Sequence, residues 1–232
     1  MTTREIATAV NANETTRELD AARAKYRGEI IPKPALAIMD AETARLAGSN
    51  LAAGALKVGE SGPDFILPDA HGEPVRLNSL LNDGPVVLIF YRGGRCPYCN
   101  LHLRGFQRRL PDIRLLGAQI VGISPQLPDI SLSTQEKNEL SFPVLSDVGN
   151  KVARQFGIVF ELSKELLKLY RHFGHALEDF NGETGKNVLP VPGTFLLDSK
   201  GIVRLVHVDV DYTRRLDPDK VIEVPKTLRT AE

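Results

Sequence analysis

The chain has 232 residues, and its 29 lysines and arginines balance 29 aspartates and glutamates to give a formal net charge of zero. This balance provides no overall field to attract nucleic acid or an anionic membrane. No apolar run approaches the roughly 20 residues of a membrane span, and the first residues lack the apolar core of a signal peptide. Two cysteines are too few for a disulfide-stapled secreted scaffold, so we expect a cytoplasmic protein.

Residues 1–57 are rich in Ala, Glu and Arg and are predicted to form a helical N-terminal extension. A helix start is predicted at 15–18, and prolines at 32 and 34 interrupt the run before a second helix from about 35 to 47. We expect these helices to pack on the body of the protein or on a second subunit, which would form a homodimer. No residue in them indicates catalysis.

Residues 58–232 are predicted to form one α/β domain. Two short apolar pieces separated by turn residues indicate an edge hairpin, and a helical turn then leads into a buried strand at 86–91. A helix from Pro97 and a second buried strand at 119–124 follow, which implies a right-handed crossover and a parallel pair. The remaining predicted elements are helices at 133–140, 150–156, 163–180 and 218–229, a strand at 142–145, and a hairpin of strands 194–198 and 202–207.

Both cysteines, Cys96 and Cys99, lie where the buried strand passes into the helix. Proline favours the first helical position, so Pro97 makes Cys96 the expected N-cap and Cys99 the third helical residue. Unpaired N–H groups and the helix dipole favour a thiolate at this end of a helix. Two sulfurs one turn apart can close a disulfide and reopen it by exchange. The spacing therefore predicts a thiol redox centre.

Zinc ligation and inert packing are the competing interpretations of the two cysteines. A structural zinc site needs about four ligands, whereas the chain has one Cys pair and scattered histidines. His172 and His175 share a predicted helix but have no third ligand nearby. We therefore expect no metal and no cofactor.

Several segments together resemble the alkyl hydroperoxide reductase/thiol-specific antioxidant family, which comprises peroxiredoxins and relatives with a thioredoxin-like fold. The matching segments between residues 58 and 207 are Pro63-Asp64-Phe65, Phe90-Tyr91, Cys96-Pro97-Tyr98-Cys99, Phe142-Pro143-Val144-Leu145 and Thr194-Phe195-Leu196-Leu197-Asp198. The resemblance implies a central mixed sheet flanked by helices. It also implies a thiol peroxidase for hydrogen peroxide or organic hydroperoxides, reset by a thioredoxin- or glutathione-type reductant.

Aligned with a typical peroxiredoxin, the attacking cysteine corresponds to Cys99, and the usual threonine three residues earlier corresponds to Cys96. The arginine that usually contacts the reacting oxygens corresponds to Pro192. Arg92 and Arg95 are therefore the candidates to stabilise the departing oxygen, and a cation at Arg95 should lower the pKa of Cys96.

Aligned with thioredoxin, the two cysteines correspond to its dithiol, and Pro192 corresponds to the cis-proline that faces it. A disulfide reductase, with Cys96 as nucleophile and Cys99 as resolving thiol, is therefore the alternative function. A redox-sensing interaction protein is a second alternative. His102, one turn past Cys99, could tune that thiol, and Tyr91 could shape the pocket, although packing is the commoner role of such an aromatic residue.

Overall fold

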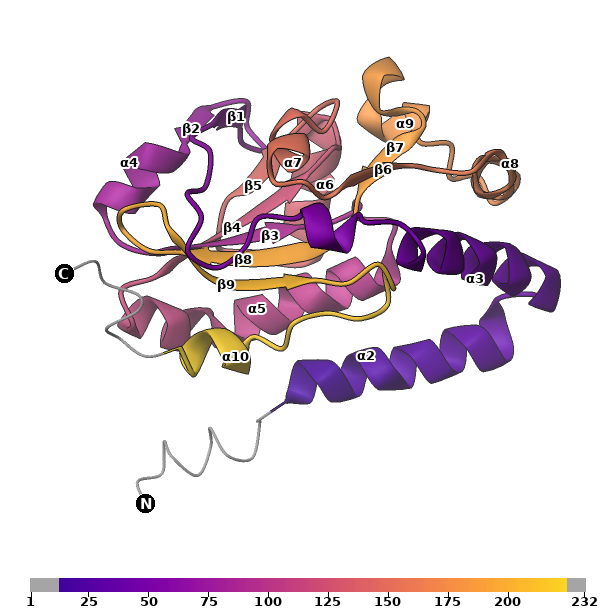
Figure 1. Cartoon of the computed structure of the whole chain (residues 1–232), viewed down its shortest axis with the longest axis horizontal. Coiled ribbons are helices and arrows are strands. Elements are labelled where there is room, and N and C mark those ends of the chain that lie inside the picture. Colours follow the sequence, from indigo (N-terminus) through magenta and orange to yellow (C-terminus); the bar gives the residue numbers. More distant parts are fainter. Residues whose placement is uncertain (1–12, 225–232) are drawn as a thin grey trace.

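The computed structural model describes residues 13–224, which form a five-stranded mixed sheet with helices on both faces (Figure 1). The strand order is β5-β4-β3-β8-β9. Its strands are β3 (Val86–Phe90), β4 (Gln119–Ser124), β5 (Val144–Ser146), β8 (Gly193–Leu197) and β9 (Val203–Val208). The first three are mutually parallel, and β8 runs antiparallel to both β3 and β9. The predicted mixed α/β sheet is confirmed.

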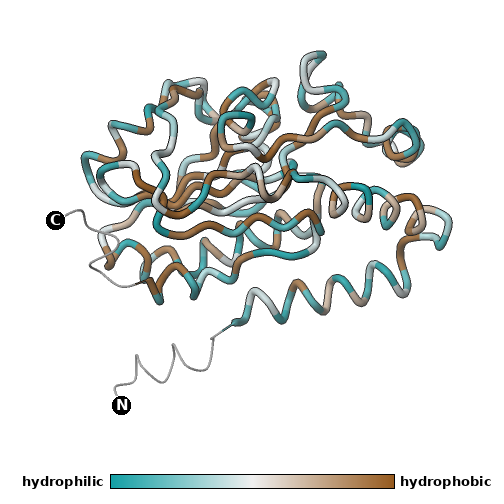
Figure 2. The backbone as a smooth tube through the Cα atoms, viewed as in Figure 1, coloured by the Kyte–Doolittle hydropathy of each residue, from teal (hydrophilic) through white to brown (hydrophobic). Residues whose placement is uncertain are grey.

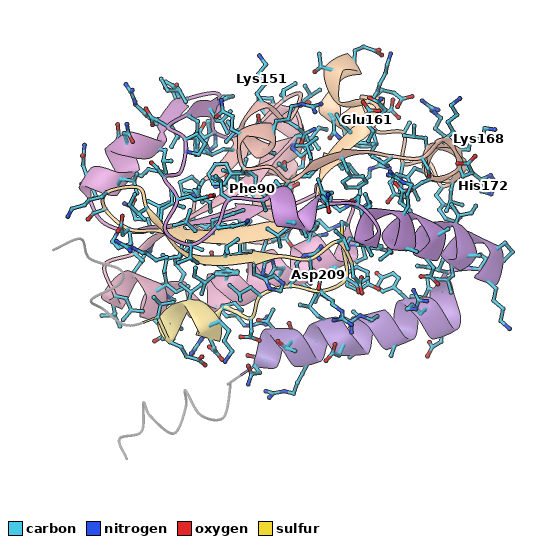
Figure 3. The ribbon with its side chains drawn as sticks, in the orientation of Figure 1. Phe90, Lys151, Glu161, Lys168, His172 and Asp209 are labelled. Carbon is cyan, nitrogen blue, oxygen red and sulfur yellow. The ribbon has the colours of Figure 1, made fainter. Side chains whose placement is uncertain are left out.

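The central strand β3 carries the core because every one of its residues is buried. Val86, Leu88 and Phe90 pack into a cluster on one face, while Val87 and Ile89 pack into a second cluster on the other. The sequence of a strand that is buried on both faces is a continuous apolar run, and the sequence of β3 is such a run. Figure 2 shows hydrophobic residues concentrated along the central strands, and Figure 3 shows Phe90 among them.

Helices cover both faces of this sheet, and shorter elements lie at its ends. The helices are α4 (Leu77–Asn82), α5 (Pro97–Leu115), α6 (Pro128–Lys137), α7 (Lys151–Gln155), α8 (Lys164–His172), α9 (Glu178–Asn181) and α10 (Asp219–Ile222). Two antiparallel pairs complete the set: β1 (Ile66–Pro68) with β2 (Pro74–Arg76), which is the predicted hairpin, and β6 (Val159–Glu161) with β7 (Val188–Pro190). In Figure 1, α5 and α10 lie on one side of the sheet, and α4 and α7 lie on the other.

The N-terminal extension is a helical hairpin that packs on this body. It consists of α2 (Glu14–Lys25), a π-helical turn η1 (Tyr26–Ile30) and α3 (Lys33–Ala47). Helix α2 lies against α5, and α3 lies against α8 (Figure 1). No helix within residues 13–224 is long and apolar enough to cross a membrane.

Three of the predicted helices differ from the observed ones. The helix predicted at 133–140 is α6, which begins at Pro128 because proline suits the first helical turn. The single helix predicted at 163–180 is two helices, because Gly174 has φ +69° and ends the first of them. The last helix is only the four residues of α10, and the rest of its predicted span, 225–229, lies outside the described residues.

The pair β6–β7 was not predicted. Each of its strands has three residues, and such short strands give almost no periodic signal.

The approach of α2 to α5 depends on Gly105. A β-carbon added there would lie 2.3 Å from Thr15 Oγ1 and 2.7 Å from Thr15 Cγ2. We expect Gly105→Ala to lower the free energy of unfolding by about 1–2 kcal/mol through overpacking, although alanine is otherwise the better helix residue. Urea unfolding measures the change.

The matched control is Gly28→Ala in η1, where an added β-carbon meets nothing within 4 Å. It should leave the stability unchanged or raise it slightly. Combining Gly105→Ala with Thr15→Ala should recover part of the loss. A stabilising Gly105→Ala variant would contradict this packing of α2 on α5.

Candidate active site

The two cysteines begin α5 as the sequence predicts. Cys96 is the N-cap and Pro97 opens the helix. Cys96 is partly exposed, whereas Cys99 is fully buried. The turn that connects β3 to the two cysteines needs a glycine at position 93, because φ there is +127°. It is held by a hydrogen bond of 2.9 Å from the Gly94 N–H to Gln126 Oε1.

The thiolate sits on Cys99 rather than Cys96. Burial by itself raises the pKa of Cys99, but a hydrogen bond from the Cys96 thiol, the charge of Arg215 and the backbone N–H of Arg92 together lower it well below the ordinary value of a thiol. The same sulfur–sulfur hydrogen bond, with burial, raises the pKa of Cys96. Cys96 is therefore a thiol that donates its proton towards a thiolate at neutral pH, and the prediction of a lowered pKa for Cys96 is wrong.

Arg215 is the residue that the sequence analysis missed. Its Nη2 donates to Cys99 Sγ at 3.5 Å, and its Nη1 donates to the carbonyl oxygens of Tyr212 and Arg214. Within residues 13–224 no carboxylate pairs with this nearly buried guanidinium. A buried cation without an anion is costly, so the Cys99 thiolate is its counter-ion. Nothing in the polar stretch around Arg215 signals this contact, because the residue is far from Cys99 in the sequence.

The segment after β9 that carries Arg215 is anchored on both sides. His102 Nε2 donates to the Leu216 carbonyl at 2.9 Å. Asp217 accepts from the Thr16 N–H at 2.9 Å and from the Thr16 hydroxyl at 2.8 Å. An ion pair of 2.7 Å joins Arg109 to Asp219. Helices α2 and α5 therefore hold the loop that supplies the cation.

The sequence leads us to expect that His102 tunes the Cys99 thiol, whereas in the structure its hydrogen bond is to the loop that carries Arg215. Burial and the charge of Arg215 lower its pKa to about 3, so the imidazole is neutral. It packs on Phe106 with ring centroids 5.0 Å apart. Its hydrogen bond to the Leu216 carbonyl makes it a support for the Arg215 loop.

The two predicted arginines have different surroundings. Arg92 donates to the Tyr170 hydroxyl and lies 4.5 Å from the Tyr212 ring centroid. Its charge, like that of Arg215, favours the thiolate form of Cys96. Arg95 is exposed, bonds the Gly174 carbonyl and His175, and stacks over Phe180. The cation that contacts a sulfur is therefore Arg215, with Arg92 nearby, and the role of Arg95 stays a prediction from the sequence.

Pro192 and Tyr91 are buried parts of the framework. The peptide bond before Pro192 is trans, so the expected cis-proline is wrong. Pro192 lines a small cavity of about 20 Å³ with Tyr212 and Arg92. Tyr91 packs in the core cluster that also holds Cys99.

His172 points outward from α8 (Figure 3), and no group of three metal-ligating side chains occurs within residues 13–224.

A larger cavity of about 420 Å³ opens beside Cys96. Its walls come from η1, α3, α8, α9, β7 and the loops after β3, β4 and β9. Four of the five tyrosines of the chain line it: Tyr26, Tyr98, Tyr170 and Tyr212. The N-terminal hairpin, in which no residue was expected to act, thus contributes a wall of the site.

Residues 58–206 of the chain match the AhpC/TSA family. A chloroplastic peroxiredoxin Q of Sedum lineare is 31% identical over 165 residues, which cover 71% of this chain and 73% of the relative. Peroxiredoxin Bcp of Escherichia coli is 29% identical over 167 residues, covering 72% and 94%. The crystal structure of peroxidoxin BcpB from Mycobacterium tuberculosis, 28% identical, aligns with a TM-score of 0.58 over 73% of this chain and 96% of that one.

The thiolate absorbance of the reduced protein should titrate well below the ordinary thiol value, because the pKa of Cys99 is lowered. Arg215→Met removes the cation at 3.5 Å and should move this titration upward, towards the ordinary thiol value of about 8.5. Arg95→Met is the matched control and should leave it in place. Equal shifts in the two variants would contradict the assignment of Arg215 as the counter-ion.

Proposed function

The chain belongs to the AhpC/TSA family and is a thiol peroxidase, and we propose that Cys99 is its attacking sulfur and Cys96 its resolving thiol. The contact between Arg215 and Cys99 carries the proposal. A peroxidase needs a thiolate at neutral pH, and Cys99 has the lowered pKa, the cation and the first-turn helix position that provide one. Cys96 has the hydrogen bond that prepares it to act second.

In the first step the Cys99 thiolate attacks the outer oxygen of a hydroperoxide and breaks the O–O bond. Cys99 becomes a sulfenic acid, and the alkoxide that leaves takes a proton from the Cys96 thiol to form an alcohol, or water from hydrogen peroxide. Arg215 and Arg92 supply positive charge where the departing oxygen becomes negative. The step leaves Cys96 as a thiolate beside the sulfenic acid.

In the second step the Cys96 thiolate attacks the Cys99 sulfenic acid. A disulfide forms, and the hydroxyl leaves as water with one proton from solvent. An external thiol reductant then supplies two electrons and restores the two thiols. We propose a thioredoxin- or glutathione-type thiol for this role, because Cys96, the more exposed sulfur, is open to attack through the cavity.

Arg215 takes the place of the arginine that is absent at Pro192. In a typical peroxiredoxin that arginine precedes the strand that corresponds to β8. In this chain the cation lies on the loop after β9. Cys96 likewise stands where the family has a threonine, so the residue that would hydrogen-bond the attacking sulfur is itself a thiol. The site can therefore resolve its sulfenic acid within one turn of helix.

Disulfide reduction remains the alternative function, but the structure gives it less support. The predicted reductase relied on a cis-proline facing the dithiol, and Pro192 is trans and buried. Its nucleophile was Cys96, the sulfur whose pKa is raised. The redox-sensing role, the homodimer and the cytoplasmic location stay predictions from the sequence.

Stopped-flow mixing of the reduced protein with hydrogen peroxide, followed by mass spectrometry, tests the assignment of the sulfurs. The wild type should react faster than an ordinary thiol and lose two hydrogen atoms as the Cys96–Cys99 disulfide forms. Cys96→Ser should still react and accumulate a sulfenic acid on Cys99 that dimedone traps. Cys99→Ser should lose the rapid reaction.

The opposite pattern, with Cys99→Ser reactive and Cys96→Ser inert, would assign the attack to Cys96. A wild type that reacts no faster than an ordinary thiol would overturn the peroxidase cycle at this site. Arg215→Met should slow the reaction at neutral pH by at least tenfold, since less thiolate is present and the departing oxygen loses its cation.

A further inference from the structure

We propose that Arg92 is the cation that stabilises Cys96 as a thiolate for the second step of the cycle, and that Tyr170 and Tyr212 position Arg92 for this role. This inference rests on the proposed peroxidase function. It goes beyond that function because it separates the two steps: Arg215 activates the attack on peroxide, and Arg92 activates the closure of the disulfide.

The Arg92 side chain is a half-buried cation held by two aromatic rings. Its Nη2 donates to the Tyr170 hydroxyl, and its guanidinium lies 5.8 Å from the Tyr170 ring centroid and 4.5 Å from that of Tyr212. A cation over a partly desolvated ring is attracted to it. Burial raises the pKa of both tyrosines, so each is a neutral phenol. The two rings therefore fix the position of the charge without neutralising it.

The carboxylate that shares a cavity with Arg92 is already paired. Glu42 lines the small cavity together with Arg92 and is the only carboxylate among the described residues that line either cavity. It accepts from Arg45 at 2.8 Å and from the Ser163 N–H at 3.2 Å. The Arg92 Nε is buried and has no hydrogen-bond partner within residues 13–224. A buried donor without a partner is costly, so this site favours an anion beside Arg92.

Cys96 becomes that anion during the cycle. Arg92 and Cys96 line the same large cavity, and the negative charge of Cys96 acts on Arg92 more strongly than that of Cys99 does. In the reduced protein Cys96 is a thiol that donates towards Cys99. After the first step Cys96 has lost its proton and Cys99 is a neutral sulfenic acid, so the negative charge lies on Cys96. The charges of Arg215 and Arg92 both favour this thiolate.

The second step needs this thiolate. Cys96 gives an electron pair to the Cys99 sulfur, the S–S bond forms, the S–O bond breaks, and the hydroxide that leaves takes a proton from solvent. The Cys96 sulfur is oxidised and the Cys99 sulfur is reduced from the sulfenic state. Because the thiolate is the nucleophile, the step slows at any pH at which Cys96 regains a proton. A cation beside Cys96 keeps it deprotonated to lower pH.

The other titratable groups on the wall of the large cavity have different partners. Arg95 is exposed and contacts His175 Nδ1 at 2.7 Å. Tyr26 packs on Tyr98 with ring centroids 5.8 Å apart, and burial raises the pKa of Tyr98 to about 12. The pH profile of disulfide formation therefore reports on the Cys96 thiol.

Quenched-flow mixing with hydrogen peroxide, followed by mass spectrometry, measures both steps. Dimedone labels the Cys99 sulfenic acid, and the loss of two hydrogen atoms reports the disulfide. Arg92→Met should slow disulfide formation about tenfold at neutral pH and move its pH midpoint upward by about one unit, because removing a neighbouring cation raises the pKa of a thiol. The attack should slow much less, because Arg215 and the backbone N–H at position 92 still act on Cys99. Arg92→Lys, which keeps the charge, should recover part of the rate.

Tyr170→Phe keeps the ring and removes the hydroxyl that accepts from Arg92. It should slow disulfide formation about threefold and leave the attack unchanged. Arg171→Met is the matched control on the next residue of α8. Arg171 lines neither cavity, and its ion pair with Glu178 is exposed, so neither step should change.

Overoxidation gives a second readout. At high peroxide a sulfenic acid that persists longer meets another peroxide and becomes a sulfinic acid. Arg92→Met should therefore accumulate more Cys99 sulfinic acid than the wild type, and Arg171→Met should not. If thermal unfolding shows that Arg92→Met is destabilised, Tyr170→Phe decides the question alone.

The outcomes separate the two proposals. A wild type that reacts no faster than an ordinary thiol overturns the proposed function, and this inference falls with it. A wild type that forms the disulfide, with Arg92→Met unchanged in the rate and pH midpoint of that step, overturns the inference and leaves the peroxidase intact. Equal slowing of both steps in Arg92→Met also overturns it. A Tyr170→Phe variant that behaves like the wild type overturns the positioning role of Tyr170.

Discussion

The active site depends on one contact, the guanidinium of Arg215 against the sulfur of Cys99. Both groups are buried, and within residues 13–224 the arginine has no carboxylate partner. A cation held in this way requires an anion, and a buried thiol becomes charged only where something outweighs its desolvation. The guanidinium therefore supplies the positive charge that stabilises the thiolate, and the thiolate supplies the negative charge that pairs with the guanidinium. The result is a thiolate inside the core, at the start of a helix whose dipole also favours it.

Most of the structure around this contact serves to keep Arg215 in place. The loop that carries it has no regular structure between β9 and α10, so its position depends on neighbours. Those neighbours are α5, through His102 and Arg109, and α2, through Thr16. The packing of α2 on Gly105 therefore bears on the chemistry as well as on stability. The extension supports the cation at one end and, through Tyr26, Ile30 and Met39, forms a wall of the cavity at the other.

The sequence predicts the sheet and the thiol pair well because both are local signals. A run of buried residues identifies β3, and proline between two cysteines identifies the N-cap. It fails where a contact joins distant segments. Arg215 and Cys99 are 116 residues apart in the sequence, and the residues next to either of them do not indicate that the two side chains are in contact. The sequence favours Arg95 because it adjoins Cys96 in the chain, yet the Arg95 side chain stacks on Phe180. Adjacency in sequence is a poor guide to which cation faces a buried sulfur.

The same contact favours completion of the catalytic cycle. Stabilising the Cys99 thiolate stabilises the reduced protein relative to its disulfide, so the disulfide becomes easier for an external thiol to reduce. Oxidation removes the negative charge and leaves Arg215 buried without its partner, which destabilises the oxidised form. The interaction that activates the sulfur towards peroxide thus also promotes return to the dithiol. A carboxylate paired with Arg215 would have weakened both effects, and this is the physical reason for a cation whose partner is the thiolate.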